Sequence, residues 1–158
     1  MQQMSIPASV FRSLLEQGRR AKWRVGPGVA FSVETPSHMA PSNREGERYI
    51  MKAARVHRFG PPEVITIEET ATQSPGDDEI LVRVAACGVG PWDAWVRAGK
   101  SVIEQPLPLT LGADLSGTVT QLGSGVSGLS LGQAVFGVTN PRFTGAYADF
   151  AVASAAMR

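Results

Sequence analysis

The sequence predicts a mainly β domain, on three observations. The chain has 158 residues, 43% of them hydrophobic and 18% charged, which is typical of a folded globular protein. Its apolar runs are short, and they are separated by turn residues drawn from 17 glycines and 11 prolines. The best-patterned stretch alternates apolar and polar residues with a period of two, as a half-buried strand does.

Residues 1–50 form an N-terminal extension of different composition. Apolar residues between Val10 and Leu15 fit one short helix ending near Gly18, and the rest is rich in glycine, proline and mixed charge, as linkers are. We favour a disordered or artefactual extension. Two alternatives stay open: an organelle transit peptide, because the region is rich in arginine, and a misassigned start, because Met51 directly precedes a strand-like segment.

Three strands are predicted after the extension. In the strongest of them, Ile80, Val82 and Val84 share one face. Gly-Pro and Pro-Gly pairs mark the turn and the loop that separate the strands. The predicted strands cover residues 51–58, 64–69 and 79–86.

A short helix is predicted next. Pro91 suits the first turn of a helix, and Gly99 suits its end. Trp92, Trp95 and Val96 lie at helical spacing, so we expect them on one face.

The segment from Leu111 to Gly137 predicts a β-hairpin. Residues 113–121 alternate, with Ala113, Leu115, Gly117 and Val119 on one face. Glycines between 123 and 128 allow a tight reversal, and residues 134–138 form the second strand. A last strand is predicted at residues 145–152, with one face made of Ala146, Ala148, Phe150 and Val152.

The reversal from Gly123 to Gly128 also matches the G-x-G-x-x-G spacing of a dinucleotide-binding turn. That turn works between a strand and a helix, where backbone N–H groups approach a pyrophosphate. Here a second strand follows, because Leu129 to Gln133 is too short for a helix and contains Gly132. We therefore interpret the segment as a hairpin loop.

Charge and cysteine content exclude several classes of function. Residues 51–158 carry eight basic and ten acidic residues and have no basic stripe, which argues against nucleic acid as a partner. No apolar run is long enough to cross a bilayer. Cys87 is the single cysteine, so no internal disulfide forms and a reducing, cytoplasmic setting is expected. At the end of an apolar strand it is interpreted as a small buried hydrophobe rather than a nucleophile.

Four separated blocks, in order and spacing, closely resemble the N-terminal half of medium-chain dehydrogenases/reductases, in the zinc-independent quinone oxidoreductase branch. The blocks are MKAARVHRFGPPEVITIEE, EILVRVAACGVGPWDAWVRAG, LGADLSGTVTQLGSGVSGLSLGQAVFG and GAYADFAV. The resemblance runs from Met51 to about Val152. It implies a GroES-like, partly open β-barrel with one or two short helices over residues 51–158, incomplete and without the Rossmann domain that completes the family's active-site cleft.

The resemblance implies that no metal is bound. Zinc-dependent relatives carry a cysteine ligand at the position of Gly90 and a histidine ligand at that of Ala113. Neither residue has a donor atom, and catalytic zinc needs three protein ligands. Asp114 matches the acidic residue beside the lost histidine. Backbone hydrogen bonding is its favoured interpretation, with a catalytic role as the alternative.

The resemblance also names candidate site residues, none of them assigned a catalytic role. Gly90, Trp92, Asp93 and Trp95 are candidates for the substrate cleft, and the glycine removes an amide donor that many relatives have. Structural alternatives stay open: the tryptophans as core residues, and Asp93 as a helix cap or an ion-pair partner of Arg97.

Two residues are candidates for contact with the cofactor. Gly90 is one, and Tyr147 is the other, because it matches a tyrosine in a Gly-x-Tyr-Ala block that lies beside the cofactor in the family. An edge-strand tyrosine is an equally open interpretation.

The resemblance implies that the intact enzyme moves hydride from NADPH to a quinone or an α,β-unsaturated carbonyl, and that it is a homodimer. We expect the chain alone to hold no cofactor tightly and to be inactive. The alternative is a stand-alone GroES-like binding module, or a pseudo-enzyme, that acts through an exposed sheet edge.

Overall fold

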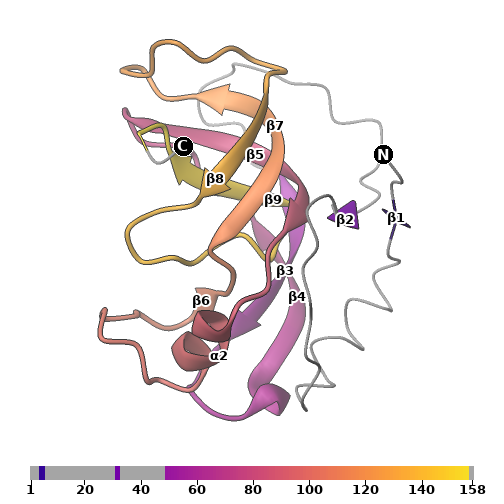
Figure 1. The fold of residues 1–158 in the computed structure, drawn as a ribbon, viewed down its shortest axis with the longest axis vertical. Helices are drawn as coiled ribbons and strands as arrows, with labels where there is room; N and C mark the ends of the chain where they lie inside the picture. Colours follow the sequence, from indigo (N-terminus) through magenta and orange to yellow (C-terminus); the bar gives the residue numbers. More distant parts are fainter. Residues whose placement is uncertain (1–3, 6–30, 33–48, 157–158) are drawn as a thin grey trace.

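The computed structural model describes residues 4–5, 31–32 and 49–156, which form a mainly β fold (Figure 1). A three-stranded sheet has the order β4-β3-β6, and a four-stranded sheet has the order β8-β7-β5-β9; every pair in these two sheets is antiparallel. Their bounds are β3 (Ile50–Val56), β4 (Ile65–Ala71), β5 (Glu79–Cys87), β6 (Leu109–Thr110), β7 (Asp114–Leu122), β8 (Ala134–Val138) and β9 (Phe150–Ser154).

Short elements complete the described part. The 3-10 turn η1 (Pro62–Val64) precedes β4, and the helix α2 (Pro91–Arg97) follows β5. In the N-terminal region, β1 (Met4–Ser5) and β2 (Phe31–Ser32) pair in parallel. The helix expected between Val10 and Gly18 lies outside the described residues. No helix in the described ranges is long and apolar enough to cross a membrane.

One segment joins the two main sheets, which together form a partly open barrel. Ala148 forms an isolated antiparallel bridge with Ala53 of β3, and the backbone N–H of Ala54 donates to the carbonyl oxygen of Tyr147 at 2.8 Å. Directly afterwards, Phe150 enters β9 and pairs with β5. The chain therefore crosses from one sheet to the other within a few residues, and the GroES-like partly open barrel with one α-helix is confirmed.

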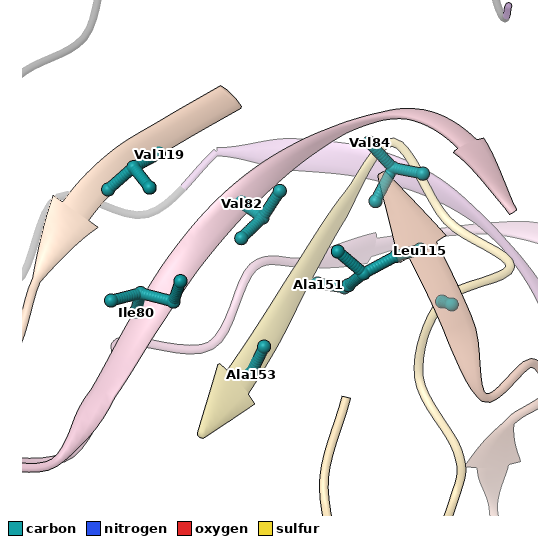
Figure 2. Packing of buried hydrophobic residues seen from close by; sticks show 8 residues of the cluster. Ile80, Val82, Val84, Leu115, Val119, Ala151 and Ala153 are labelled. Carbon is teal, nitrogen blue, oxygen red and sulfur yellow. The ribbon is translucent and has the colours of Figure 1, made fainter. Parts of the chain in front are cut away.

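The main core lies between β5, β7 and β9 (Figure 2). Ile80, Val82 and Val84 of β5 face it, as the alternation predicts, and Val82 and Val119 have no exposed surface. Burying one such side chain contributes about 1.5–3 kcal/mol. The cluster consists of Ile80, Val82, Val84, Leu115, Val119, Ala146, Ala151 and Ala153.

A second buried cluster attaches helix α2 to the three-stranded sheet. Val96 is its contribution from the helix, and Tyr147 is its contribution from the segment that joins the sheets. The remaining members are Ala54, Val56, Val64, Leu109 and Leu111. This cluster fixes the helix, and with it the candidate site, on the scaffold.

The predicted last strand is corrected by the structure. Regular pairing with β5 starts only at Phe150, because Tyr147, Ala148 and the N–H of Asp149 pair with β3, and only the carbonyl oxygen of Asp149 already accepts from Val84 of β5. Ala151 and Ala153 face the main core, and Val152, which we placed on the buried face with Phe150, is only half-buried. The short strand β6 was not predicted, because two residues beside a proline carry no alternation.

Candidate functional site

Helix α2 starts at a proline that follows an extended glycine. Gly90 is the N-cap residue (φ −121°, ψ 168°), and Pro91 is the first helical residue, where its missing N–H leaves no bond unmade. Asp93 reaches back to the cap: its Oδ2 accepts a hydrogen bond from the Gly90 N–H at 2.7 Å. The capping interpretation of Asp93 is confirmed. Arg97 instead donates from Nε to the carbonyl oxygen of Gly60 at 3.2 Å.

Asp93 is a buried carboxyl, with 6% of its surface exposed. Its Oδ1 is fully buried and has no hydrogen-bond partner of good geometry among the described residues. Burial raises the pKa of the Asp93 carboxyl, and the nearby charge of Asp114 adds to the increase. The backbone N–H of Gly90, the hydroxyl of Tyr147 and the backbone N–H of Gly112 oppose it, but the net direction is upward.

Tyr147 lies on the buried side of the same site, with 3% of its surface exposed. Its hydroxyl donates to the carbonyl oxygen of Gly88 at 3.2 Å, and its ring lies against Gly112. Burial, followed by the charge of Asp93, raises the pKa of Tyr147 far above its usual range, so the hydroxyl stays a neutral donor. Its expected contact with a cofactor stays a prediction, since the buried ring acts here as a support for the backbone.

Cys87 ends β5 beside these groups and packs against both core clusters. Burial raises the pKa of its thiol to about 12, and the charges of Asp93 and Asp114 contribute. The thiol is therefore protonated at neutral pH and is a poor nucleophile. This agrees with the interpretation of Cys87 as a small buried hydrophobe.

The two tryptophans of α2 point away from the core, which corrects the predicted helical face. Trp92 is 43% exposed and Trp95 is 59% exposed, whereas Val96 is 6% exposed and joins the second cluster. Successive helical residues are about 100° apart around the axis, so Trp95 and Val96 face different sides. Asp93 and Val96, three residues apart, form the inward side.

Gly90 makes room for the neighbouring indole. A Cβ atom built on Gly90 would overlap the ring of Trp92 at Cε2 and Cζ2, and it would lie 2.8 Å from Cδ2. The Trp92 ring therefore occupies the space that any other side chain at position 90 would fill. Among the predicted cleft residues, Gly90 and Trp92 form a surface layer, with Asp93 beneath it and Trp95 one turn further along.

The donor set does not fit a catalytic metal. Gly90 and the buried Ala113 have no ligating atom, and no group of three histidine, cysteine, aspartate or glutamate side chains is placed to hold a metal in the described part of the chain. Asp114 is half-buried, and its carboxyl lies beside Gly88. The hydrogen bonding to backbone expected of that carboxyl stays a prediction.

The glycine-rich reversal is a hairpin loop between β7 and β8, as predicted. The Gly123 N–H donates to the carbonyl oxygen of Glu79 at 2.8 Å, and the Gly125 N–H donates to that of Asp77 at 2.9 Å. The Ser124 hydroxyl donates to Asp77 Oδ1 at 2.5 Å. These donors bond to Asp77 and to Glu79 at the start of β5, which favours a hairpin loop over a phosphate cradle.

Sequence reasoning missed two glycines of the site. Gly88 supplies the carbonyl oxygen that anchors Tyr147, and Gly112 adopts a left-handed conformation (φ 95°) below the tyrosine ring. A glycine next to a predicted strand is a signal for a close backbone approach. It does not reveal which ring approaches, because Tyr147 lies far along the chain.

Comparison with protein families places the site in a known domain type. Residues 76–157 match the alcohol dehydrogenase GroES-like domain. A quinone oxidoreductase from Sus scrofa is 39% identical over 106 residues, which is 66% of this chain and 32% of the pig protein. The chain thus spans about a third of the length of the curated relatives it matches.

Solved structures give the same result. The quinone oxidoreductase from Coxiella burnetii is 32% identical, with a TM-score of 0.62 over 67% of this chain and 35% of that one. The Escherichia coli quinone oxidoreductase, solved in complex with NADPH, is 27% identical, with a TM-score of 0.57 over 66% of this chain and 31% of that one.

Proposed function

The chain belongs to the alcohol dehydrogenase GroES-like domain family, with quinone oxidoreductases among its relatives, and from this we propose that it forms the substrate-side part of an NADPH-dependent quinone or enone oxidoreductase. The observation that carries the proposal is the surface of α2. Two exposed indoles, Trp92 and Trp95, lie over the buried carboxyl of Asp93, on the segment that matches the relatives. Aromatic rings with few polar groups are typical of small-molecule sites.

In this proposal NADPH supplies the hydride, and the residues of this chain shape the space around the acceptor. Gly90, Trp92 and Trp95 form the substrate wall and exclude water from it. Asp93 and Tyr147 position that wall, because one caps the helix at Gly90 and the other holds the Gly88 carbonyl oxygen. We assign these residues to the nicotinamide end of the cofactor, since the N–H groups of Gly123 and Gly125 in the hairpin loop already donate to carbonyl oxygens.

The proposal includes a zinc-independent reaction in the cytoplasm by the intact homodimer. Zinc independence is supported by Gly90 and Ala113, which have no donor atoms at the ligand positions. A single cysteine supports a reducing compartment. The partner is then a small uncharged acceptor rather than a nucleic acid or a membrane.

A domain transplant tests the proposal. The matching third of the pig quinone oxidoreductase is replaced by residues 51–156 of this chain, and quinone-dependent NADPH oxidation is measured. We expect the transplant to be active and the pig enzyme lacking that third to be inactive. A folded transplant that binds NADPH but reduces neither quinones nor enones would refute the proposed function.

A second candidate function is favoured by the edge of the four-stranded sheet. Strand β8 ends its sheet, Phe136 on it is 80% exposed, and an apolar groove of about 200 Å³ lies beside it. An open sheet edge beside a groove suits a binding module that accepts an extended peptide. Size-exclusion chromatography of the purified chain distinguishes the two: a defined soluble species supports the module, and heterogeneous material contradicts it.

A further inference from the structure

We propose that Trp92 is a specificity-determining residue, and that its indole, held in the side-chain space of Gly90, selects flat conjugated rings over puckered enones of similar size. This inference rests on the proposed function and deepens it by naming what the substrate wall recognises. It concerns a feature of this chain, because a residue other than glycine at position 90 would displace the ring.

The Trp92 ring is held in place by its contact with Gly90. A Cβ at that glycine would overlap two ring atoms, so the ring lies directly on the backbone. Part of the ring is therefore covered by Gly90, and 43% of the residue remains exposed to meet a ligand. A large ring seated on backbone loses little further freedom on binding, which favours affinity.

The backbone below the ring is itself fixed. The Gly90 N–H is bound by Asp93 Oδ2 at 2.7 Å, and the Asp93 N–H donates back to the Gly90 carbonyl oxygen at 3.2 Å. Pro91 restricts φ between them, and Tyr147 holds the Gly88 carbonyl oxygen at 3.2 Å. The Trp92 ring and the Gly90 backbone against which it lies are therefore preorganised by groups that a ligand does not touch.

The exposed side chains from Val89 to Val96 are apolar and uncharged. Val89 is 68% exposed and Trp95 is 59% exposed, whereas Asp93, the only charged residue from Val89 to Val96, is 6% exposed. The glycine at position 90 offers no side-chain donor to polarise a carbonyl group. Recognition then depends on the ring face, and aromatic rings prefer offset stacking with other flat rings.

The test uses the full chain without cofactor and two probes that lack an open position for thiol addition. Duroquinone is flat and conjugated, and isophorone is a puckered cyclic enone of similar size. Binding is followed by the NMR signals of the backbone and indole N–H groups. The indole signals report each tryptophan separately, and the backbone signals of α2 report binding in the Trp92 variants as well. We expect duroquinone to shift the Trp92 signal in a saturable manner and isophorone to bind roughly 10-fold more weakly, because only the flat ring stacks.

Three variants distinguish stacking on the Trp92 ring from nonspecific hydrophobic binding. Trp92→Leu keeps an apolar side chain and should weaken duroquinone binding roughly 5- to 10-fold, whereas Trp92→Phe keeps a ring and should stay within about 3-fold of the wild type. Gly90→Ala keeps the indole but displaces it, so it should weaken binding as Trp92→Leu does. The matched control is Phe143→Leu, at an aromatic residue between β8 and β9 that is 38% exposed, and it should bind normally.

Equal binding of the two probes, or unchanged binding in Trp92→Leu or Gly90→Ala, overturns the proposal. Circular dichroism of each variant establishes that it is folded. If Trp92→Leu disturbs the helix, Trp92→Phe and Gly90→Ala still test the proposal. The proposed function fails separately, because it is measured as NADPH oxidation in the transplant, whereas this binding needs no cofactor.

Discussion

The carboxyl of Asp93 gives the clearest prediction for a single residue. Burial places its pKa above the ordinary value of 3.8 in the folded protein. As pH rises, the unfolded chain therefore ionises first, and between the two pKa values the folded state binds more protons. The free energy of unfolding then falls as pH rises from the unfolded pKa through the folded pKa. Asp93→Asn removes this titration.

The stability of Asp93→Asn relative to the wild type should therefore increase as pH rises above about 4 and then level off. Urea unfolding of both proteins over a pH series measures the difference. Asp114 titrates in both proteins, so its own contribution largely cancels. A difference that is constant with pH would show that burial does not disfavour the charged form of Asp93.

Gly112 gives a prediction about crowding beneath the site. It combines a left-handed backbone (φ 95°) with a Tyr147 ring whose Cγ would lie 2.9 Å from an added Cβ. Gly112→Ala should lower the free energy of unfolding by roughly 2–5 kcal/mol, from conformational strain and overpacking together. Chemical denaturation measures the loss.

The matched control is Gly128→Ala. Gly128 also has a positive φ (78°), but an added Cβ would meet nothing within 4 Å, so only the conformational strain of roughly 1–2 kcal/mol remains. Equal losses in the two variants would mean that the tyrosine ring moves aside freely. The Tyr147 hydroxyl would then not fix the Gly88 carbonyl oxygen.

At the scale of single residues, the sequence predicted local roles, such as helix capping, better than the burial of each side chain. The pattern Gly90-Pro91 and the spacing to Asp93 indicated a capped helix, because capping depends on residues within one turn. Nothing local indicated that the carboxyl is buried, since its burial depends on Tyr147, more than fifty positions further along the chain. Long-range contacts of this kind leave no periodic trace in one sequence.

Strand β8 gives a prediction at the scale of an element. It is the edge of its sheet, and Phe136 on it is 80% exposed. Natural edges avoid strand addition by carrying charges, especially lysine. Phe136→Lys should therefore reduce self-association at high concentration while changing the free energy of unfolding by less than about 0.5 kcal/mol, as expected for a surface position.

Static light scattering and urea unfolding measure the two effects. Val102→Lys is the control, because Val102 is fully exposed and lies outside the strands but receives the same charge. If both variants reduce association equally, the cause is net charge and not the edge of β8.

Elements differ in how well the sequence predicts them. Strand β7 was predicted almost completely, because its alternation holds from Asp114 to Val119 and Leu115 and Val119 pack on one core. Strand β9 was placed too early, because Tyr147 to Asp149 hydrogen-bond to β3 before Phe150 begins to pair with β5. A segment that changes partner halfway keeps a strand-like pattern in its sequence while its boundaries and buried face shift.

At the scale of the whole molecule, the partly open barrel followed from four blocks of family resemblance rather than from composition. Composition and alternation predicted only strands and turns. The joining of the two sheets through Ala148 and Phe150 depends on pairing over about a hundred residues, between β3 and the segment before β9. The order of the blocks carried that information, because relatives share topology as well as residues.

The hydrogen bonds of the glycine-rich loop between β7 and β8 give the last prediction, which concerns NADPH binding. The N–H groups of Gly123 and Gly125 are bound to carbonyl oxygens of the preceding loop, and the Asp77 carboxylate beside them repels phosphate. The described residues thus carry the proposed acceptor wall, and the glycine loop beside Asp77 does not suit a pyrophosphate. We expect the purified chain to show no saturable NADPH binding in a fluorescence titration and no quinone-dependent NADPH oxidation.

The pig quinone oxidoreductase under the same conditions is the positive control. Saturable NADPH binding by this chain, or turnover above the rate without protein, would contradict the prediction. It would mean that the phosphate groups are held elsewhere, because at the one glycine motif with suitable spacing in the described ranges the N–H groups of Gly123 and Gly125 already donate to Glu79 and Asp77. The proposed quinone recognition at Trp92 and the cofactor binding are therefore measured independently of each other.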